Sequence, residues 1–159
     1  MEKNQRTTAL KFILLTGLLV GSLDITSAFV DYYIVRGGNP FMVLRYVASG
    51  VFRKTAFTGS GIMYFWGLFF HFIIAYSFTV FFYFIYPKLK LIKFNPVVTG
   101  ILYGIFIWAV MNLIVVPIVF ATPWHYNGFK TIKAALILIA MIGLPLSFIM
   151  RKHFSRTSI

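Results

Sequence analysis

Long apolar runs separated by short polar segments dominate the chain. Four such runs cover residues 10–34, 62–86, 96–121 and 134–150. A helix needs about 20 predominantly apolar residues, with a range of about 17–25, to cross the hydrocarbon core of a bilayer. Membrane-spanning strands would instead give alternating segments of about 10 residues. The pattern therefore predicts an all-α integral membrane protein, with one domain (1–159) of four transmembrane helices.

A shorter apolar segment lies between the first two runs, at about residues 40–53. Gly37 and Gly38 end the first helix, and Asn39 followed by Pro40 is typical of a helix start. The segment is too short to span a bilayer, and its apolar positions alternate with polar ones such as Arg45. Two interpretations stay open: an amphipathic interfacial helix on the bilayer surface, or a re-entrant lid with Arg45 turned inward.

Composition supports a membrane location. Of the 159 residues, 60% are hydrophobic and only 11% are charged, whereas soluble domains average about 45–50% and about 25%. These values exclude a soluble enzyme, a soluble nucleic-acid-binding protein and a disordered tail. The chain has no cysteine, which excludes disulfides and thiolate sites.

The distribution of basic residues predicts the orientation. Cytoplasmic flanks of membrane helices carry an excess of Lys and Arg. Nine bases fall on the side of the two termini: Lys3, Arg6, Lys11, Lys88, Lys90, Lys93, Arg151, Lys152 and Arg156. Six fall on the other side: Arg36, Arg45, Arg53, Lys54, Lys130 and Lys133. We therefore expect both termini in the cytoplasm. Residues 1–28 also match a secretory signal, but the apolar run continues to Ile34, so we expect the first helix to be retained.

One face of the first predicted helix is small or acidic. Gly17, Gly21, Asp24, Ala28 and Asp31 share this face, and Asp24 falls near the middle of the span. Small residues allow another helix to approach closely. A carboxylate at that depth must be protonated, paired or hydrated. Asp31 lies nearer the end of the span and can reach water or a loop base, and Arg45 is one candidate partner for either acid.

The other predicted helices have similar faces. Gly67 and His71 share a face of the second, Gly100, Gly104 and Asn112 of the third, and Gly143 belongs to the fourth. Because polar groups avoid lipid, we expect Asp24, His71 and Asn112 to meet inside the bundle. Pro117 and Pro145 predict kinks in the last two spans.

Two functions fit this interior. In one, Asp24 and His71 take up and release a proton, or line a path for a small solute, as Asp and His chains do in pumps and transporters. In the other, the two residues form a hydrogen-bonded pair that only stabilises the fold, with Ser27 or Asn112 as further partners. For Asn112 alone, the structural role is favoured.

Several chemistries lack the residues they need. A zinc site takes three or four ligands, and the spans offer only Asp24, Asp31 and His71. The chain has no GxSxG, HExxH or P-loop motif. We therefore expect no enzymatic activity, no metal and no cofactor.

Three stretches give the chain a resemblance to a known family: GLLVGSLDITSAF (17–29), HFIIAYSFTVFFYFIYPKLKL (71–91) and GILYGIFIWAVMNLIVVPIVFATP (100–123). In the second, a histidine begins an apolar run that ends in a Pro-Lys-x-Lys loop. The chain resembles the YagU-like uncharacterised bacterial inner-membrane proteins, and it departs from them over residues 45–59 and in Asp24. The resemblance implies four helices in a bacterial inner membrane and no established activity.

These patterns predict a small proton-linked transporter or channel-like protein that uses Asp24 and His71. The alternative is a structural or accessory membrane protein that binds partner helices or lipids. Membrane lipids are expected partners, a homo-oligomer or a membrane-protein partner is compatible with either function, and nucleic acid is not expected.

Overall fold

The structure is a computed structural model that describes residues 2–121 and 127–157, and the side chains of residues 7–121 and 127–155. The described part of the chain is helical and contains no strand. Four of its helices are long and apolar enough to cross a membrane: Thr7–Arg36, Ile62–Lys88, Pro96–Phe120 and Gly128–Ser155. The predicted fold class is confirmed.

The first two spans are single helices, whereas the last two contain π-helical turns. The elements in chain order are α1 (Glu2–Arg36), α2 (Met42–Phe52), α3 (Thr55–Thr58), α4 (Ile62–Lys88), the 3₁₀ turn η1 (Leu91–Lys93), α5 (Pro96–Ala109), the π turn η2 (Val110–Val115), α6 (Val116–Phe120), α7 (Gly128–Leu138), the π turn η3 (Ile139–Gly143) and α8 (Leu144–Thr157). Elements α5, η2 and α6 form the third span, and α7, η3 and α8 form the fourth. The chain therefore crosses four times and adds the short apolar helix α2 between the first two crossings.

The fourth span extends further than the sequence predicts at both ends. The expected limits were 134–150, but the helical segment begins at Gly128 and continues past Arg151. Lys130, Lys133 and Arg151 lie in these extra turns. Long basic side chains can place their charges at the membrane surface while the backbone stays helical, so charge marks the end of the apolar core and not the end of the helix.

Asparagine caps begin the last two spans. The side chain of Asn95 accepts a hydrogen bond from the backbone nitrogen of Val97 at 2.8 Å, and Pro96 occupies the first helical position. The side chain of Asn127 accepts from the nitrogen of Lys130 in the same way. These caps satisfy backbone donors that a helix start leaves open.

Each π turn is followed directly by an α-helix whose second residue is a proline. Pro117 follows η2 by two residues and Pro145 follows η3 by two residues. Proline has no backbone N–H for the carbonyl four residues earlier. A wider turn that bonds to the fifth residue re-satisfies such carbonyls, and π turns are frequent at functional sites. The prolines thus mark places where the last two spans are locally unwound.

Six glycines lie where helices approach closely. A methyl group at Gly17 or Gly21 of α1 would overlap Tyr76 or Phe72 of α4, and one at Gly67 of α4 would overlap the backbone of Leu44 in α2. The third and fourth spans meet backbone to backbone. A methyl group at Gly143 would overlap the carbonyl of Gly100, and one at Gly104 would lie 2.6 Å from the Cα atom of Ile139. The small faces are therefore used within the chain, in three separate helix pairs.

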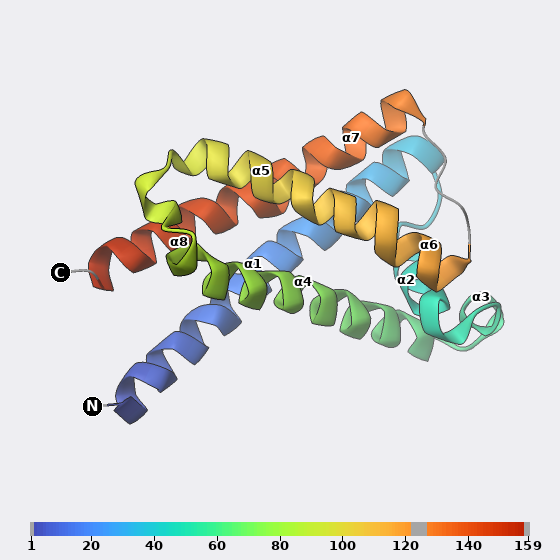
Figure 1. The fold of residues 1–159 in the computed structure, drawn as a ribbon. Helices are drawn as coiled ribbons and strands as arrows, with labels where there is room; N and C mark the ends of the chain where they lie inside the picture. Colours follow the sequence, from blue (N-terminus) through green and yellow to red (C-terminus); the bar gives the residue numbers. More distant parts are fainter. Residues whose placement is uncertain (1, 122–126, 158–159) are drawn as a thin grey trace.

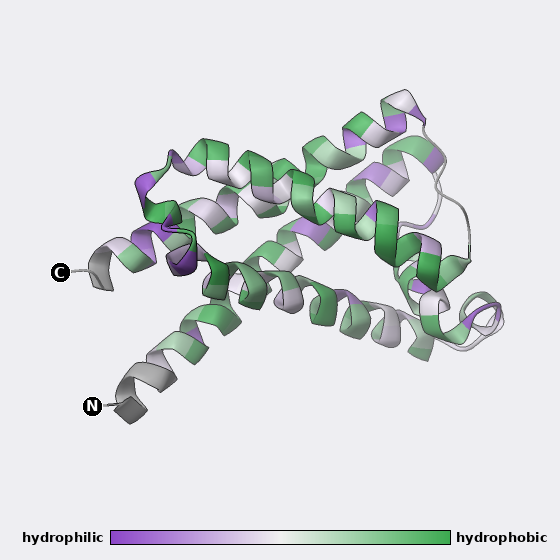
Figure 2. Ribbon diagram, in the orientation of Figure 1, coloured by the Kyte–Doolittle hydropathy of each residue, from purple (hydrophilic) through white to green (hydrophobic). Residues whose placement is uncertain are grey.

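The two ends of the bundle differ. The N- and C-termini lie at one end, and α2, α3 and the beginning of α7 lie at the other (Figure 1). Hydrophobic residues dominate the long helices, and hydrophilic ones gather near the ends and within α1 (Figure 2). The buried core includes Val20, Phe82, Ile107, Ile142 and Leu146, from all four spans. This core closes the bundle between the termini and the polar part of α1.

Candidate functional site

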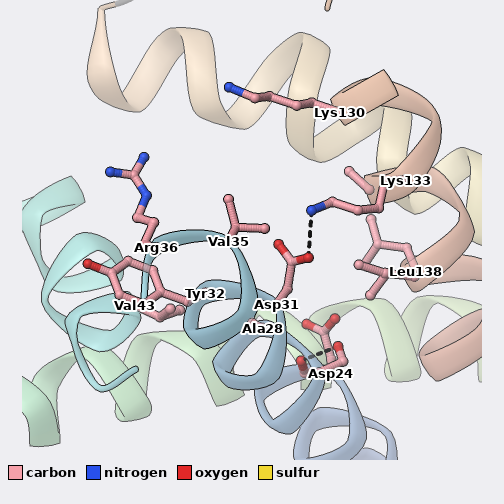
Figure 3. Close-up of a pocket in the computed structure, with 13 residues that line it drawn as sticks. Asp24, Ala28, Asp31, Tyr32, Val35, Arg36, Val43, Lys130, Lys133 and Leu138 are labelled. Atoms are coloured by element: carbon pink, nitrogen blue, oxygen red, sulfur yellow. Dashed lines mark hydrogen bonds and ion pairs between the residues drawn. The ribbon is translucent and has the colours of Figure 1, made fainter. Parts of the chain in front are cut away.

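A pocket that contains several ionisable side chains opens between the carboxyl-terminal half of α1 and α7, with Val43 of α2 at one side. Its volume is about 430 Å³. The chain has three acidic residues, and two of them, Asp24 and Asp31, line this pocket. Three basic residues also line it: Arg36, Lys130 and Lys133. Figure 3 shows both carboxylates projecting from α1 into the same space.

Asp31 forms an ion pair with Lys133. The Nζ atom of Lys133 lies 2.6 Å from Oδ1 of Asp31, and the two side chains are 29% and 37% exposed, respectively. The pair joins α1 to α7 across 102 positions of sequence. Asp31 therefore has its counter-ion in the fourth span and not in the segment around α2.

Asp24 lies deeper along the same face of α1. It is seven residues before Asp31, about two helical turns or about 10 Å along the axis, and its side chain is only partly exposed. Its carboxylate faces the pocket, below the Asp31–Lys133 pair (Figure 3). The Ser27 hydroxyl donates to the backbone oxygen of Asp24 at 2.7 Å. Ser27 therefore lines the pocket and bonds to the helix backbone.

His71 of α4 is held against the backbone of α1. Its Nε2 atom lies 2.9 Å from the carbonyl oxygen of Gly21, and its side chain is 8% exposed. A carbonyl only accepts hydrogen bonds, so Nε2 carries the hydrogen and donates it. Asp24 and His71 interact electrostatically. The structure thus differs from the expected direct hydrogen bond: the imidazole bonds to the backbone one turn before Asp24, and the two ionisable groups interact through space.

The close approach at Gly21 explains this arrangement. A side chain at that position would meet the ring of Phe72, next to His71 on α4. Without one, α4 comes near enough for His71 to reach the backbone of α1. The glycine that the sequence assigns to helix packing therefore also places the histidine beside Asp24.

Arg45 is directed away from the acidic residues. Its Nη1 atom donates to the carbonyl oxygens of Ala56 at 2.9 Å and Phe57 at 2.8 Å, and its guanidinium lies 4.6 Å from the centre of the Tyr64 ring. The sequence left open whether Arg45 reaches Asp24 or Asp31, and the structure corrects that idea. Arg45 fastens α3 and the start of α4 to α2, and Lys133 takes the role of counter-ion.

Asn112 also lies outside the pocket. Its side chain donates to the carbonyl oxygen of Trp108, four residues earlier, at 3.0 Å. It belongs to the π turn η2, and among the described residues it is not one of those lining the Asp24 pocket. The expected meeting of three polar residues is thus reduced to Asp24 and His71. Asn112 instead satisfies a backbone carbonyl of the turn that contains it.

Four polar pocket residues were not singled out as site residues from the sequence: Tyr32, Arg36, Lys130 and Lys133. The three bases were counted only as evidence of orientation. One signal could have identified Lys133. Two acids in one span need counter-ions, and Asp31 is predicted near the end of the bundle where Arg36, Lys130 and Lys133 also lie.

The fold and pocket define a multi-pass, all-helical membrane protein with an ionisable pocket at one end of the bundle. Comparisons with protein-family models, curated proteins and solved structures gave no match. Chemically, the pocket can exchange protons at Asp24, supply an ion pair at Asp31 and Lys133, and present positive charge at Arg36 and Lys130.

Proposed function

We propose that the protein is a small proton-linked transporter or channel-like protein of a bacterial inner membrane, in which Asp24 and His71 take up and release the proton. The observation that carries the proposal is the position of Asp24. It faces a pocket of about 430 Å³, and His71 of the neighbouring span bonds to the α1 backbone one turn before it. Intramembrane carboxylates with such neighbours are typical of proton relays.

In the proposed mechanism, a proton enters from the end of the bundle where α2 lies. It passes the Asp31–Lys133 pair and protonates Asp24. His71 carries its hydrogen on Nε2 and donates it to the carbonyl oxygen of Gly21, one helical turn before Asp24. In this mechanism the proton of Asp24 passes to Nδ1 of the imidazole, because Nε2 already carries a hydrogen.

Release on the opposite side requires a rearrangement of the bundle. Val20 of α1 and Ile142 of η3 are 0% and 4% exposed, and they close the route from the pocket toward the termini. Ile142 lies within a π turn, a rare wide turn that is frequent at functional sites. We infer that η3 is the element that moves when the proton leaves.

The predicted orientation sets the direction of access. If the termini are cytoplasmic, as the excess of nine bases over six favours, then the pocket faces the periplasm. A proton-driven protein draws protons from that side under an ordinary membrane potential.

The alternative is a structural or accessory protein whose small-residue faces bind partner helices or lipids, and the glycine contacts bear on the partner-helix form of it. Gly17 and Gly100 would be central to such a face, but both are occupied inside the chain, by Tyr76 and by Gly143. This leaves fewer small surfaces for a partner helix and favours the proton-linked function.

Proton movement into proteoliposomes tests the proposal. With a pH-sensitive dye inside and a potassium diffusion potential, vesicles containing the protein should acidify faster than protein-free vesicles. His71→Ala and Asp24→Asn should each abolish the excess rate while the protein remains folded. Equal rates for the variants and the wild type would remove the transport proposal.

A further inference from the structure

The pocket is lined by three basic and two acidic residues, and two of the bases, Arg36 and Lys130, form no ion pair among the described side chains. Lys133 is neutralised by Asp31 at 2.6 Å. Arg36 lies 5.7 Å from the centre of the Tyr32 ring, a contact that leaves its charge in place, and Lys130 is exposed. Figure 3 shows Arg36 and Lys130 extending from α1 and α7, both apart from the Asp31–Lys133 pair. Two cations separated in this way suit an anionic group between them.

An apolar groove continues from this pocket along the outer side of α1. It has a volume of about 770 Å³ and shares Ser27, Asp31 and Ile137 with the pocket. Its walls are otherwise mainly apolar side chains of α1 and the fourth span, among them Leu19, Leu23 and Met141. Its lining extends from Leu15 to Ile34, which corresponds to about 28 Å of helix. One acyl chain needs only half of the hydrocarbon core, which is about 30 Å thick.

We propose that this combined surface is a binding site for one anionic phospholipid. Its phosphate lies between Arg36 and Lys130 at the pocket mouth, and one acyl chain lies in the groove between α1 and the fourth span. Basic pockets at the ends of membrane helices recognise anionic headgroups in this way. Charge and shape agree: Arg36 at the end of α1 and Lys130 in the first turn of α7 form no ion pair among the described side chains, and the apolar groove continues from the pocket that they line. The inference does not depend on proton transport.

Thermal unfolding in detergent with added lipid measures this binding. Phosphatidylglycerol should raise the melting temperature of the wild type more than phosphatidylcholine does. Arg36→Gln with Lys130→Gln should weaken phosphatidylglycerol binding by about 25-fold, or about fivefold for each charge. Lys88→Gln with Lys90→Gln makes the same change of charge at the other end of the bundle, and it should weaken binding by less than about fivefold. Equal losses in the two double variants would overturn the proposal, because they would show a nonspecific charge effect.

The acyl chain and the source of the phosphate need separate variants and probes. Thr26 lines the groove and is exposed, so Thr26→Trp should fill it and reduce phosphatidylglycerol binding. Ser77→Trp, at an exposed position of α4, is the matched control and should not. Glycerol phosphate alone should not reproduce the shift in melting temperature. If glycerol phosphate does reproduce it, or if Thr26→Trp binds the lipid like the wild type, the surface is not a phospholipid site. Because the readout is lipid binding, its failure is distinct from a failure of proton flux.

Discussion

The Nζ atom of Lys133 lies 2.6 Å from Oδ1 of Asp31, and this contact joins the first and fourth spans above Asp24. It explains how a carboxylate near the end of an apolar helix is tolerated, because the opposite charge comes from a helix 102 residues away. It also places a polar entrance over the deeper acid.

The first prediction concerns the strength of this pair. Both side chains are about one-third exposed, so water screens their attraction. A double-mutant cycle with Asp31→Asn and Lys133→Gln, measured by unfolding in detergent, should give a coupling free energy below about 1 kcal/mol. A coupling free energy several times larger would mean that the pair is shielded from water and contributes strongly to stability, which would contradict its place at a water-accessible entrance.

The second prediction concerns the glycine contacts. Gly67→Ala and Gly143→Ala should each lower the free energy of unfolding by about 1–3 kcal/mol, because the added methyl group overlaps rigid backbone at Leu44 and at Gly100. Gly61→Ala is the matched control, since a methyl group there meets nothing within 4 Å. If all three variants unfold at the same temperature, the close backbone contacts at Gly67 and Gly143 would be contradicted.

The third prediction concerns access to Asp24. The chain has no cysteine, so a single introduced thiol can be labelled without background. Asp24→Cys should react with a membrane-impermeant thiol reagent applied from the side of α2. Val20→Cys, one turn earlier at a fully buried position, should not react. Labelling of Asp24→Cys only from the side of the termini would contradict the position of the pocket.

The fourth prediction concerns Arg45. Its hydrogen bonds to the carbonyls of Ala56 and Phe57 hold α3 against α2, and hydrogen bonds from a charged donor are worth about 1.5–3 kcal/mol each. Arg45→Gln should therefore speed proteolysis between α2 and α4 by at least about tenfold. Lys54→Gln, an exposed neighbour, should leave the cleavage rate unchanged. Protection of the Arg45 variant equal to the wild type would show that α3 is held by other contacts.

Hydrophobic patterning was sufficient to predict the four spans and the short helix α2, because a helix that crosses a bilayer needs a continuous apolar run. The small faces could also be identified, since Gly17 and Gly21 repeat at helical spacing. Their partners could not be predicted, because the same spacing allows any helix to approach. Gly67 in fact contacts Leu44 of the short helix, and not another span.

The polar contacts were harder to predict than the spans. Lys133 lies so far from Asp31 along the chain that only the packing of α7 against α1 brings the two together. Arg45 was nearer to the acids in sequence, yet carbonyls at the exposed end of α3 satisfy it. The π turns could not be predicted because Pro117 and Pro145 indicate a disturbed helix but not which wider turn replaces it.

Proton uptake by Asp24→Asn tests the central claim most directly, with Asp31→Asn as its control. Both variants make the same chemical change on the same face of α1, two turns apart, and both positions line the pocket. The account predicts that proteoliposomes containing Asp24→Asn acidify no faster than protein-free vesicles, while those containing Asp31→Asn keep at least half of the wild-type rate. Wild-type flux in the Asp24→Asn variant would contradict it.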